Sequence, residues 1–214
     1  MDITNGEITL LNTILHAFIL GFGLILPLGV QNVFVFNQGA AHRSYLHALP
    51  VILTAAICDT ILILAAVFGV SLLILTFSWL QAVLYTIGFF FLLYMGWMLW
   101  KSKPADKGAA AHEKSNTKMQ ILFAASVSLL NPHAIMDTVG VIGTNSIQYI
   151  GSEKWAFTIC VILVSWIWFF SLAFAGHFMG MRDPKGQFIA KLNKVSAVLI
   201  WGVAIYMAVH LAQL

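Results

Sequence analysis

LPLGVQN at residues 26–32 and LNPHAIMD at residues 130–137 each place a proline inside a long apolar stretch, with a polar side chain five residues later. Pro27 and Pro132 are 105 residues apart, and the two polar side chains are separated by the same interval. A proline inside a membrane-spanning helix frees backbone groups, which is tolerated where the backbone is buried in protein or lines a cavity. Matching interruptions in two halves of a chain point to the binding site of a transporter. The pattern therefore favours a carrier over a membrane anchor.

The composition is that of a protein dissolved mainly in lipid. Of 214 residues, 60% are hydrophobic and 9% are charged, against about 25% charged residues in a soluble domain. Apolar runs of about 20 residues are long enough to cross a bilayer. Six such runs are expected to form spanning helices, at residues 8–36, 46–68, 79–100, 119–143, 154–179 and 190–212. We therefore predict an all-α integral membrane protein in which the first and fourth helices are broken at their prolines.

The basic residues predict the orientation of these spans. Ten of the eleven Lys and Arg residues fall in odd-numbered loops, and Lys154 is the exception. Because loops rich in Lys and Arg stay in the cytoplasm, the odd loops are expected inside and both termini outside. The net charge of +3 arises from these loops, and no basic face with interleaved aromatic residues remains to indicate a nucleic-acid partner.

An odd number of spans in each half predicts an inverted repeat. Residues 1–100 and 119–214 would each hold three spans and would lie in opposite orientations in the membrane. The polar stretch 101–118 contains a proline, a glycine and seven charges, which is typical of a solvated cytoplasmic linker. The whole chain, 1–214, is interpreted as one transporter domain. Its small-residue patches fit either packing within one subunit or a homo-oligomer.

Two carboxylates lie inside the predicted spans. Asp59 is near the centre of the second span, and Asp137 lies beyond Pro132 in the fourth. A charged side chain near the bilayer centre costs at least about 2.5 kcal/mol, so it normally faces the bundle interior and has a partner. The Lys and Arg residues lie in the loops or at the ends of the spans, so none is expected to be buried as a partner for either one. The cation is then expected to be a substrate, a metal ion or a proton, and the alternative is a protonated aspartic acid bonded to a neighbouring carbonyl or hydroxyl.

These residues together resemble the LysE/ArgO-type exporters of lysine and arginine. The resemblance covers nearly the whole chain and rests on residues 26–32, Asn37-Gln38-Gly39, Cys58-Asp59, Leu130-Asn131-Pro132-His133 and Asp137-Thr138. It implies a carrier of the bacterial inner membrane that expels basic amino acids. Val30 stands where these exporters usually have a second proline. The related exporters of neutral amino acids usually have an apolar residue in place of Asp137, so this carboxylate favours a cationic substrate.

Arginine and lysine combine a cationic side chain with a zwitterionic backbone, so their site needs an anionic end and a donor-rich end. Asp59 and Asp137 are expected to hold the side chain, by bidentate contact in the case of a guanidinium. Three free amides at the broken helices are expected to hold the carboxylate and the amine, helped by the positive end of a half-helix. These amides belong to Gln31, Asn32 and Asn131.

Two further residues complete the expected site. Gly29, two residues after Pro27, is expected to allow the unwound conformation that the first break needs. His133 is open to two interpretations, a proton shuttle or substrate contact on one side and a structural histidine on the other. No cofactor is expected, and neither an enzyme nucleophile motif nor a nucleotide-binding loop is found in the sequence.

Export of a cation from the cytoplasm needs a driving force, because the membrane potential opposes it. Exporting a cation against an inside-negative potential costs about 2.3 kcal/mol per 100 mV, and exchange for one proton would cancel this cost. A carboxylate removed from water holds a proton readily when no cation is present. Asp59 and Asp137 are therefore the expected proton-coupling residues of an alternating-access antiporter. The sequence leaves open arginine against lysine, the coupling stoichiometry and the oligomeric state.

Two other classes remain open at this stage. His133 and Asp137 are four residues apart and could, with Asp59, form a site for a divalent metal ion. No His-rich loop is present to collect the metal, but a metal-ion exporter is the main alternative. An intramembrane enzyme that uses His133 and Asp137 as base and orienting residue is the second alternative.

Overall fold

The computed structural model describes residues 3–26, 29–41, 44–69, 78–101, 117–129, 131–183 and 186–211, and every regular element within them is a helix. Backbone groups inside a bilayer have no water to bond, so a helix that pairs them internally is the stable solution for such apolar segments. The all-α prediction is confirmed. The elements are α1 (Ile3–Ile25), α2 (Val30–Ala41), the 3-10 helix η1 (Tyr45–Ala48), α3 (Leu49–Val67), α5 (Ser78–Lys101), α6 (Thr117–Leu129), α7 (Pro132–Asp137), the π-helix η2 (Thr138–Gly143), α8 (Thr144–Ser146), α9 (Gly151–Arg182) and α10 (Gln187–Leu211).

Three to five membrane spans are supported by helix length and composition within the described residues. Tyr45–Val67, Gly151–Arg182 and Gln187–Tyr206 are each long and apolar enough to cross a membrane. Two bent pairs, Thr9–Ile25 with Val30–Ala41 and Thr117–Leu129 with Ala134–Ser146, each count as one further span when taken together. The remaining expected span coincides with α5, in which a shorter apolar helix is found. A six-span count stays a prediction.

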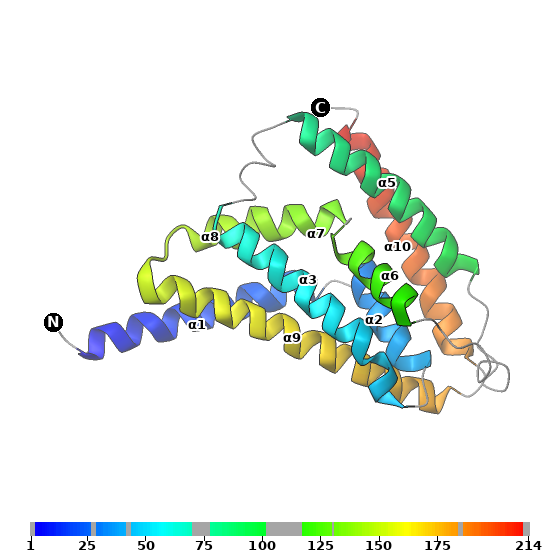
Figure 1. Cartoon of the computed structure of the whole chain (residues 1–214), viewed down its shortest axis with the longest axis horizontal. Helices are drawn as coiled ribbons and strands as arrows, with labels where there is room; N and C mark the ends of the chain where they lie inside the picture. The colour runs from blue at the N-terminus through cyan, green and yellow to red at the C-terminus, as the bar shows by residue number, and fades with distance from the viewer. Residues whose placement is uncertain are drawn as a thin grey trace.

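The helices pack into one bundle, with α9 along one side and the α5–α10 pair on the other (Figure 1). α9 contacts α1, α2 and α3, while α3 also contacts α6 and η2, and α5 packs against α10. Three clusters of buried apolar side chains hold these contacts together. The first lies among α2, α3, α6 and α9, the second among α2, α5, α6 and α10, and the third among α1, α3, η2 and α9.

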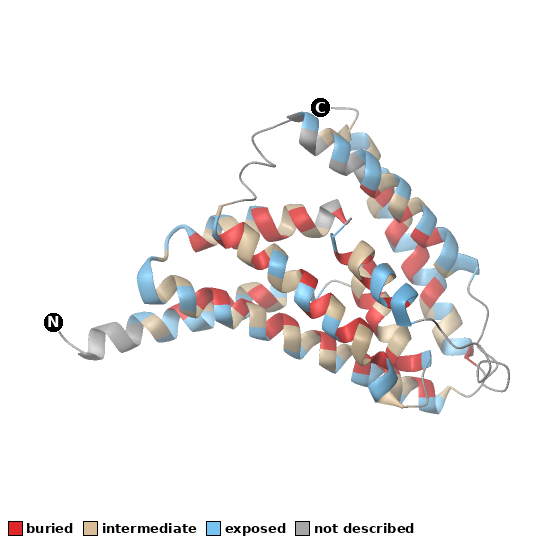
Figure 2. Cartoon of the chain, in the orientation of Figure 1, coloured by how far each residue is buried: buried red, intermediate tan, exposed pale blue. Residues whose placement is uncertain are grey.

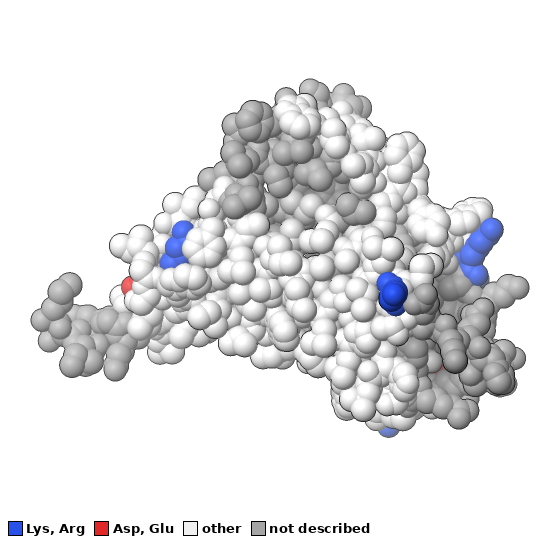
Figure 3. Space-filling view, viewed as in Figure 1, with Lys and Arg blue, Asp and Glu red and all other residues white. Residues whose placement is uncertain are grey.

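The outer surface of the bundle is apolar. Large hydrophobic side chains point outward on most helices, among them Leu11, Ile61, Ile167 and Ile205, which are each more than half exposed. Figure 2 shows this as exposed segments that alternate with buried ones along each helix. Few charged side chains interrupt the face drawn in Figure 3. A soluble protein rarely exposes so much apolar surface, whereas a lipid-facing one requires it.

Helices α2 and α9 approach each other closely because small residues lie between them. A Cβ atom added at Gly39 would overlap the carbonyl of Ala173, and one added at Gly176 would overlap the carbonyl of Phe36. Small residues let helix backbones come together in a membrane, where packing rather than water exclusion drives helix association. The close approach fixes α2, which begins at the first helix break, against the longest helix of the bundle.

The start of α10 is capped by Asp183, the residue that follows α9. Gly186 has a positive φ of 62°, a conformation that glycine adopts at little cost. The Asp183 carboxylate accepts hydrogen bonds from the first backbone N–H groups of α10, at Gln187 (3.1 Å) and Phe188 (2.8 Å). An acidic side chain is stabilising at a helix N-terminus because it pairs free N–H groups and opposes the helix dipole.

Candidate substrate site

The first helix break separates α1 from α2 and is held by a side chain. The axes of the two helices differ by 79°, and Pro27 lies outside the described residues. Asn32, on the first turn of α2, donates a hydrogen bond of 2.7 Å from Nδ2 to the carbonyl of Ile25, the last residue of α1. Its Oδ1 accepts a bond of 3.2 Å from the Trp168 indole N–H on α9. The carbonyl that the break frees is therefore paired inside the protein, as a bilayer requires.

The second break lies between α6 and α7. Asn131 is in an extended conformation (φ −88°, ψ 96°), and Pro132 follows as the first residue of α7. Proline is tolerated there because the first helical residues have no intrahelical acceptor for an N–H. The chain then passes into the π-helix η2, a form that is common at functional sites. The bend between the two arms is 54°.

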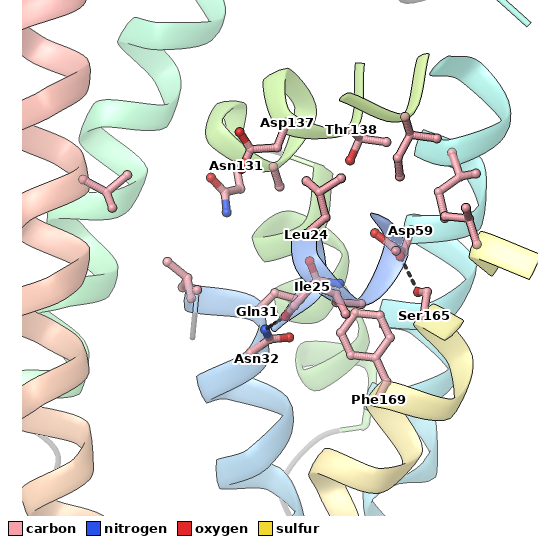
Figure 4. A pocket seen from close by; sticks show the side chains of 18 of the residues that line it. Leu24, Ile25, Gln31, Asn32, Asp59, Asn131, Asp137, Thr138, Ser165 and Phe169 are labelled. Atoms are coloured by element: carbon pink, nitrogen blue, oxygen red, sulfur yellow. Dashed lines mark hydrogen bonds between the residues drawn. The ribbon is translucent and has the colours of Figure 1, made fainter. Parts of the chain in front are cut away.

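A cavity of about 430 Å³ lies where the two breaks come together (Figure 4). Its size is within the usual range for a small-molecule site, about 300–1,000 Å³. Apolar side chains and glycines of α1, α2, α3, α5, η2, α9 and α10 form most of the wall. No Lys or Arg is found among its described lining residues. The polar lining residues are Gln31, Asn32, Asp59, Asn131, Asp137, Thr138 and Ser165.

Asp59 projects from α3 into this cavity, next to α9. The Ser165 hydroxyl on α9 donates a hydrogen bond to Asp59 Oδ2. One residue further along both helices, the Trp166 indole N–H donates a bond of 3.0 Å to Thr60 Oγ1. The two hydrogen bonds join the same pair of helices, but only the residues of the first bond, Asp59 and Ser165, line the cavity.

Two amides that line the cavity have unused hydrogen-bonding atoms. Among the described residues, no partner is found for Gln31 Nε2 or for Asn131 Oδ1, although both atoms are buried. Leaving a buried polar atom unpaired costs about 1–3 kcal/mol. One atom is a donor and the other an acceptor, and a primary amide can exchange these roles by rotating. Both atoms are therefore available to a polar ligand.

The structure brings most of the predicted site residues together. Six of them line the one cavity: Gly29, Gln31, Asn32, Asp59, Asn131 and Asp137. Pro132 starts α7 as described above, while Pro27 and the side chain of His133 lie outside the described part of the chain. One expectation needs correction, because the amide of Asn32 is not free but is engaged by Ile25 and Trp168. Its substrate contact stays a prediction.

Two residues of the site region were not predicted, Ser165 and Trp168, and Thr138, noted above only as part of the Asp137-Thr138 motif, also lines the cavity. Nothing in the sequence distinguishes Ser165 or Trp168, because serine and tryptophan are common in membrane helices. In addition, the described residues hold no group of three or more His, Cys, Asp or Glu side chains placed to bind a metal ion. The metal-exporter alternative therefore has no ligand cluster in this part of the chain.

Comparison with known proteins gives consistent matches over nearly the full length. A family model described as "LysE type translocator" matches residues 12–211. A Bacillus subtilis (strain 168) protein named "Putative amino-acid transporter YisU" is 50% identical over 201 residues, covering 94% of this chain and 91% of that protein. The "Arginine exporter protein ArgO" of Pectobacterium carotovorum subsp. carotovorum (strain PC1) is 34% identical over 201 residues, covering 92% and 96% respectively. The protein of the same name from Salmonella typhimurium is 34% identical over 198 residues, covering 90% and 92%. No solved structure matches the chain.

Proposed function

The chain belongs to the LysE type translocator family, a family of transporters and not of enzymes, and we propose that it exports arginine, lysine or both from the bacterial cytoplasm. It is a multi-pass membrane protein that moves amino acids. The proposal adds the basic substrate, the outward direction, the inner-membrane location and exchange for a proton. The two relatives named as arginine exporters support this choice of substrate.

The observation that carries the proposal is a cavity with two carboxylates and no basic lining residue among those described. Asp59 comes from α3 and Asp137 from the end of α7, and both face the same space. Opposite charges attract strongly where water is scarce. A guanidinium or ammonium group that enters this space meets two carboxylate acceptors, whereas an anionic side chain of a ligand would be repelled by them. The arrangement therefore favours a cationic side chain over a neutral one.

The amides supply contacts for the other end of the substrate. Gln31 Nε2 can donate to an α-carboxylate, and Asn131 Oδ1 can accept from an α-ammonium group, because both are buried without partners in the described structure. Gly29 and Val30, at the start of α2, also line the cavity. The N-terminus of a helix carries free N–H groups and a partial positive charge, which favour an anion. These contacts suit the backbone that all α-amino acids share.

The helix contacts support an inverted repeat. The first half comprises α1, α2, α3 and α5, and the corresponding elements of the second half are α6, the α7–η2 segment, α9 and α10. When each element is replaced by its counterpart, a helix contact in one half corresponds to a helix contact in the other. The contacts of α9 with α1 and α2 become those of α3 with α6 and η2, and the α2–α10 contact becomes the α7–α5 contact. Helices α3 and α9 run in opposite directions in Figure 1, as do α5 and α10. A central cavity between such repeats suits alternating access.

Exchange for a proton is the simplest coupling for this site. Moving one cation out against the membrane potential costs about 2.3 kcal/mol per 100 mV, and an incoming proton cancels the charge movement. Asp59 and Asp137 can each hold either a proton or part of the substrate cation, but not both at one oxygen. Competition for the same carboxylates then links the two fluxes, which makes these residues the proposed coupling groups.

Counterflow in proteoliposomes tests the substrate directly. Purified protein is reconstituted into vesicles that are loaded with unlabelled arginine, and the uptake of labelled arginine is measured. Lysine, ornithine, citrulline and alanine are then added outside as competitors. Citrulline is nearly isosteric with arginine but neutral, so it isolates the contribution of charge. We expect arginine or lysine to compete well and citrulline to compete poorly. Equal competition by citrulline or alanine would contradict a basic substrate.

A further inference from the structure

The hydroxyl of Ser165 has an unusual partner for a serine within a helix. Serine and threonine side chains inside helices commonly bond the carbonyl four residues earlier. Ser126, Ser128 and Thr158 do so here, with carbonyl distances of 2.7 to 3.0 Å. Ser165 donates instead to the Asp59 carboxylate across the α3–α9 contact. Ser165 itself is 2% exposed and lines the cavity.

We propose that Ser165 is a positioning residue that orients the Asp59 carboxylate toward the substrate cation, an inference that rests on the proposed function. A carboxylate in a cavity can turn about its last side-chain bond. The hydrogen bond from Ser165 engages Oδ2 and leaves Oδ1 for the ligand. Figure 4 shows Asp59 and Ser165 together on one side of the view, apart from Asp137 and Asn131. The guanidinium or ammonium group then meets an anion whose orientation is already set.

Preorientation affects binding more than the later steps of the cycle. A ligand that binds a disordered carboxylate must first restrict its rotation, and that ordering reduces affinity. Ser165 also supplies a hydrogen bond to an ionised acceptor, and such bonds are stronger than bonds between neutral groups. Loss of the hydroxyl should therefore raise the KM for the basic amino acid while the protein still folds and cycles.

Thr60 provides a matched control for this inference. It accepts a hydrogen bond of 3.0 Å from Trp166, so it joins the same two helices one residue away from the Asp59–Ser165 contact. It is not among the residues that line the cavity. Thr60→Val removes this contact between the helices while keeping the shape of the side chain. An effect on helix packing would therefore be shared by both variants, and an effect on the ligand would not.

The test compares three variants in the arginine counterflow assay, together with the stabilisation of the purified protein against heat by arginine. We expect Ser165→Ala to raise the KM about tenfold, with a change of less than about threefold in the maximal rate. Ser165→Thr keeps the hydroxyl and should restore the KM to within about threefold of the parent. Thr60→Val should leave the KM unchanged. The arginine concentration needed for half-maximal thermal stabilisation should rise in Ser165→Ala alone.

Each other result overturns the inference. An unchanged KM in Ser165→Ala would show that the hydroxyl does not position the anion. An equal rise in KM in Thr60→Val would assign the effect to helix packing. Asp59→Asn separates this inference from the proposed function. If that variant transports arginine normally, the proposed site itself fails. If it is inactive while Ser165→Ala behaves as the parent, only the role of Ser165 fails.

Discussion

Asn32 and Ile25 face each other across the first helix break and are joined by a hydrogen bond of 2.7 Å from the amide Nδ2 to the carbonyl oxygen. A break in a membrane helix leaves such a carbonyl without its usual partner, and lipid offers no substitute. The amide takes the place of the missing backbone donor. Its oxygen is bonded by Trp168 on α9, which ties the break to the longest helix of the bundle. The bend is therefore held in one conformation by specific hydrogen bonds.

Replacing Asn32 should destabilise the protein even in the absence of substrate. In Asn32→Leu the shape is roughly kept, but the carbonyl of Ile25 and the indole N–H of Trp168 both lose their partner. Each unpaired buried group costs about 1–3 kcal/mol. We expect a lower thermal unfolding temperature in detergent, with a smaller decrease in Trp168→Phe, which removes the indole N–H and part of the ring but leaves the Asn32–Ile25 hydrogen bond in place. An Asn32→Leu protein as stable as its parent would contradict this account of the break.

The two carboxylates should differ in what they contribute to transport. Asp59→Asn and Asp137→Asn keep the shape but remove the anion, so each should lower arginine counterflow by more than about tenfold at normal expression. Asp137→Asn should also raise the rate for citrulline relative to arginine, because the cavity then holds one anion fewer. The ratio of labelled citrulline to labelled arginine uptake measures this directly. Near-normal arginine flux in either variant would contradict the assignment of that residue to the substrate site.

The contact between α2 and α9 should tolerate no added side chain. A Cβ atom at Gly176 would overlap the carbonyl oxygen of Phe36, whereas one at Gly202 on α10 meets no atom within 4 Å. Overpacking of a tight contact costs about 1–3 kcal/mol. We expect Gly176→Ala to lower the unfolding temperature and Gly202→Ala to leave it unchanged or raise it slightly, since alanine favours a helix. Equal behaviour of the two variants would contradict the close packing.

The features that the lipid bilayer dictates, namely the helices, the two helix breaks and the interior carboxylates, could be predicted from the sequence. Apolar runs predicted the helices, because lipid leaves few alternatives to a helix, and the spacing of the two prolines predicted the two breaks. The two aspartates could be assigned to an interior cavity because an anion facing lipid is costly. Both breaks and both carboxylates do line one cavity.

Contacts between helices could not be predicted in the same way. Ser165 meets Asp59 only because α3 and α9 cross at these residues, and 106 positions separate them in the chain. The amide of Asn32 was expected to be free, but its Nδ2 bonds the carbonyl of Ile25, which becomes available only once the backbone bends. Helix ends also shifted: the span expected at 154–179 is the longer α9, Gly151–Arg182, because Gly151 and the Asp183 turn set its limits.

The orientation in the membrane is open to a direct test at the two ends of α9. This helix has 32 residues, about 48 Å at 1.5 Å per residue, which exceeds the hydrocarbon thickness of about 30 Å. Gln148 precedes it and Gln187 follows it, and both side chains are exposed. The two positions should therefore lie on opposite sides of the membrane. Four basic residues surround the Gln187 end, namely Arg182, Lys185, Lys191 and Lys194, so this end is predicted to be cytoplasmic.

Single cysteines introduced by Gln148→Cys and Gln187→Cys, in a Cys58→Ala and Cys160→Ala background, report this arrangement in intact cells. An impermeant thiol reagent added outside should label the first protein and spare the second, and permeabilised cells should label both. Labelling of the second alone would reverse the orientation and place both termini in the cytoplasm. Labelling of both from outside would mean that α9 does not cross the membrane, since a continuous helix of this length cannot present both ends on one side of a bilayer that it spans.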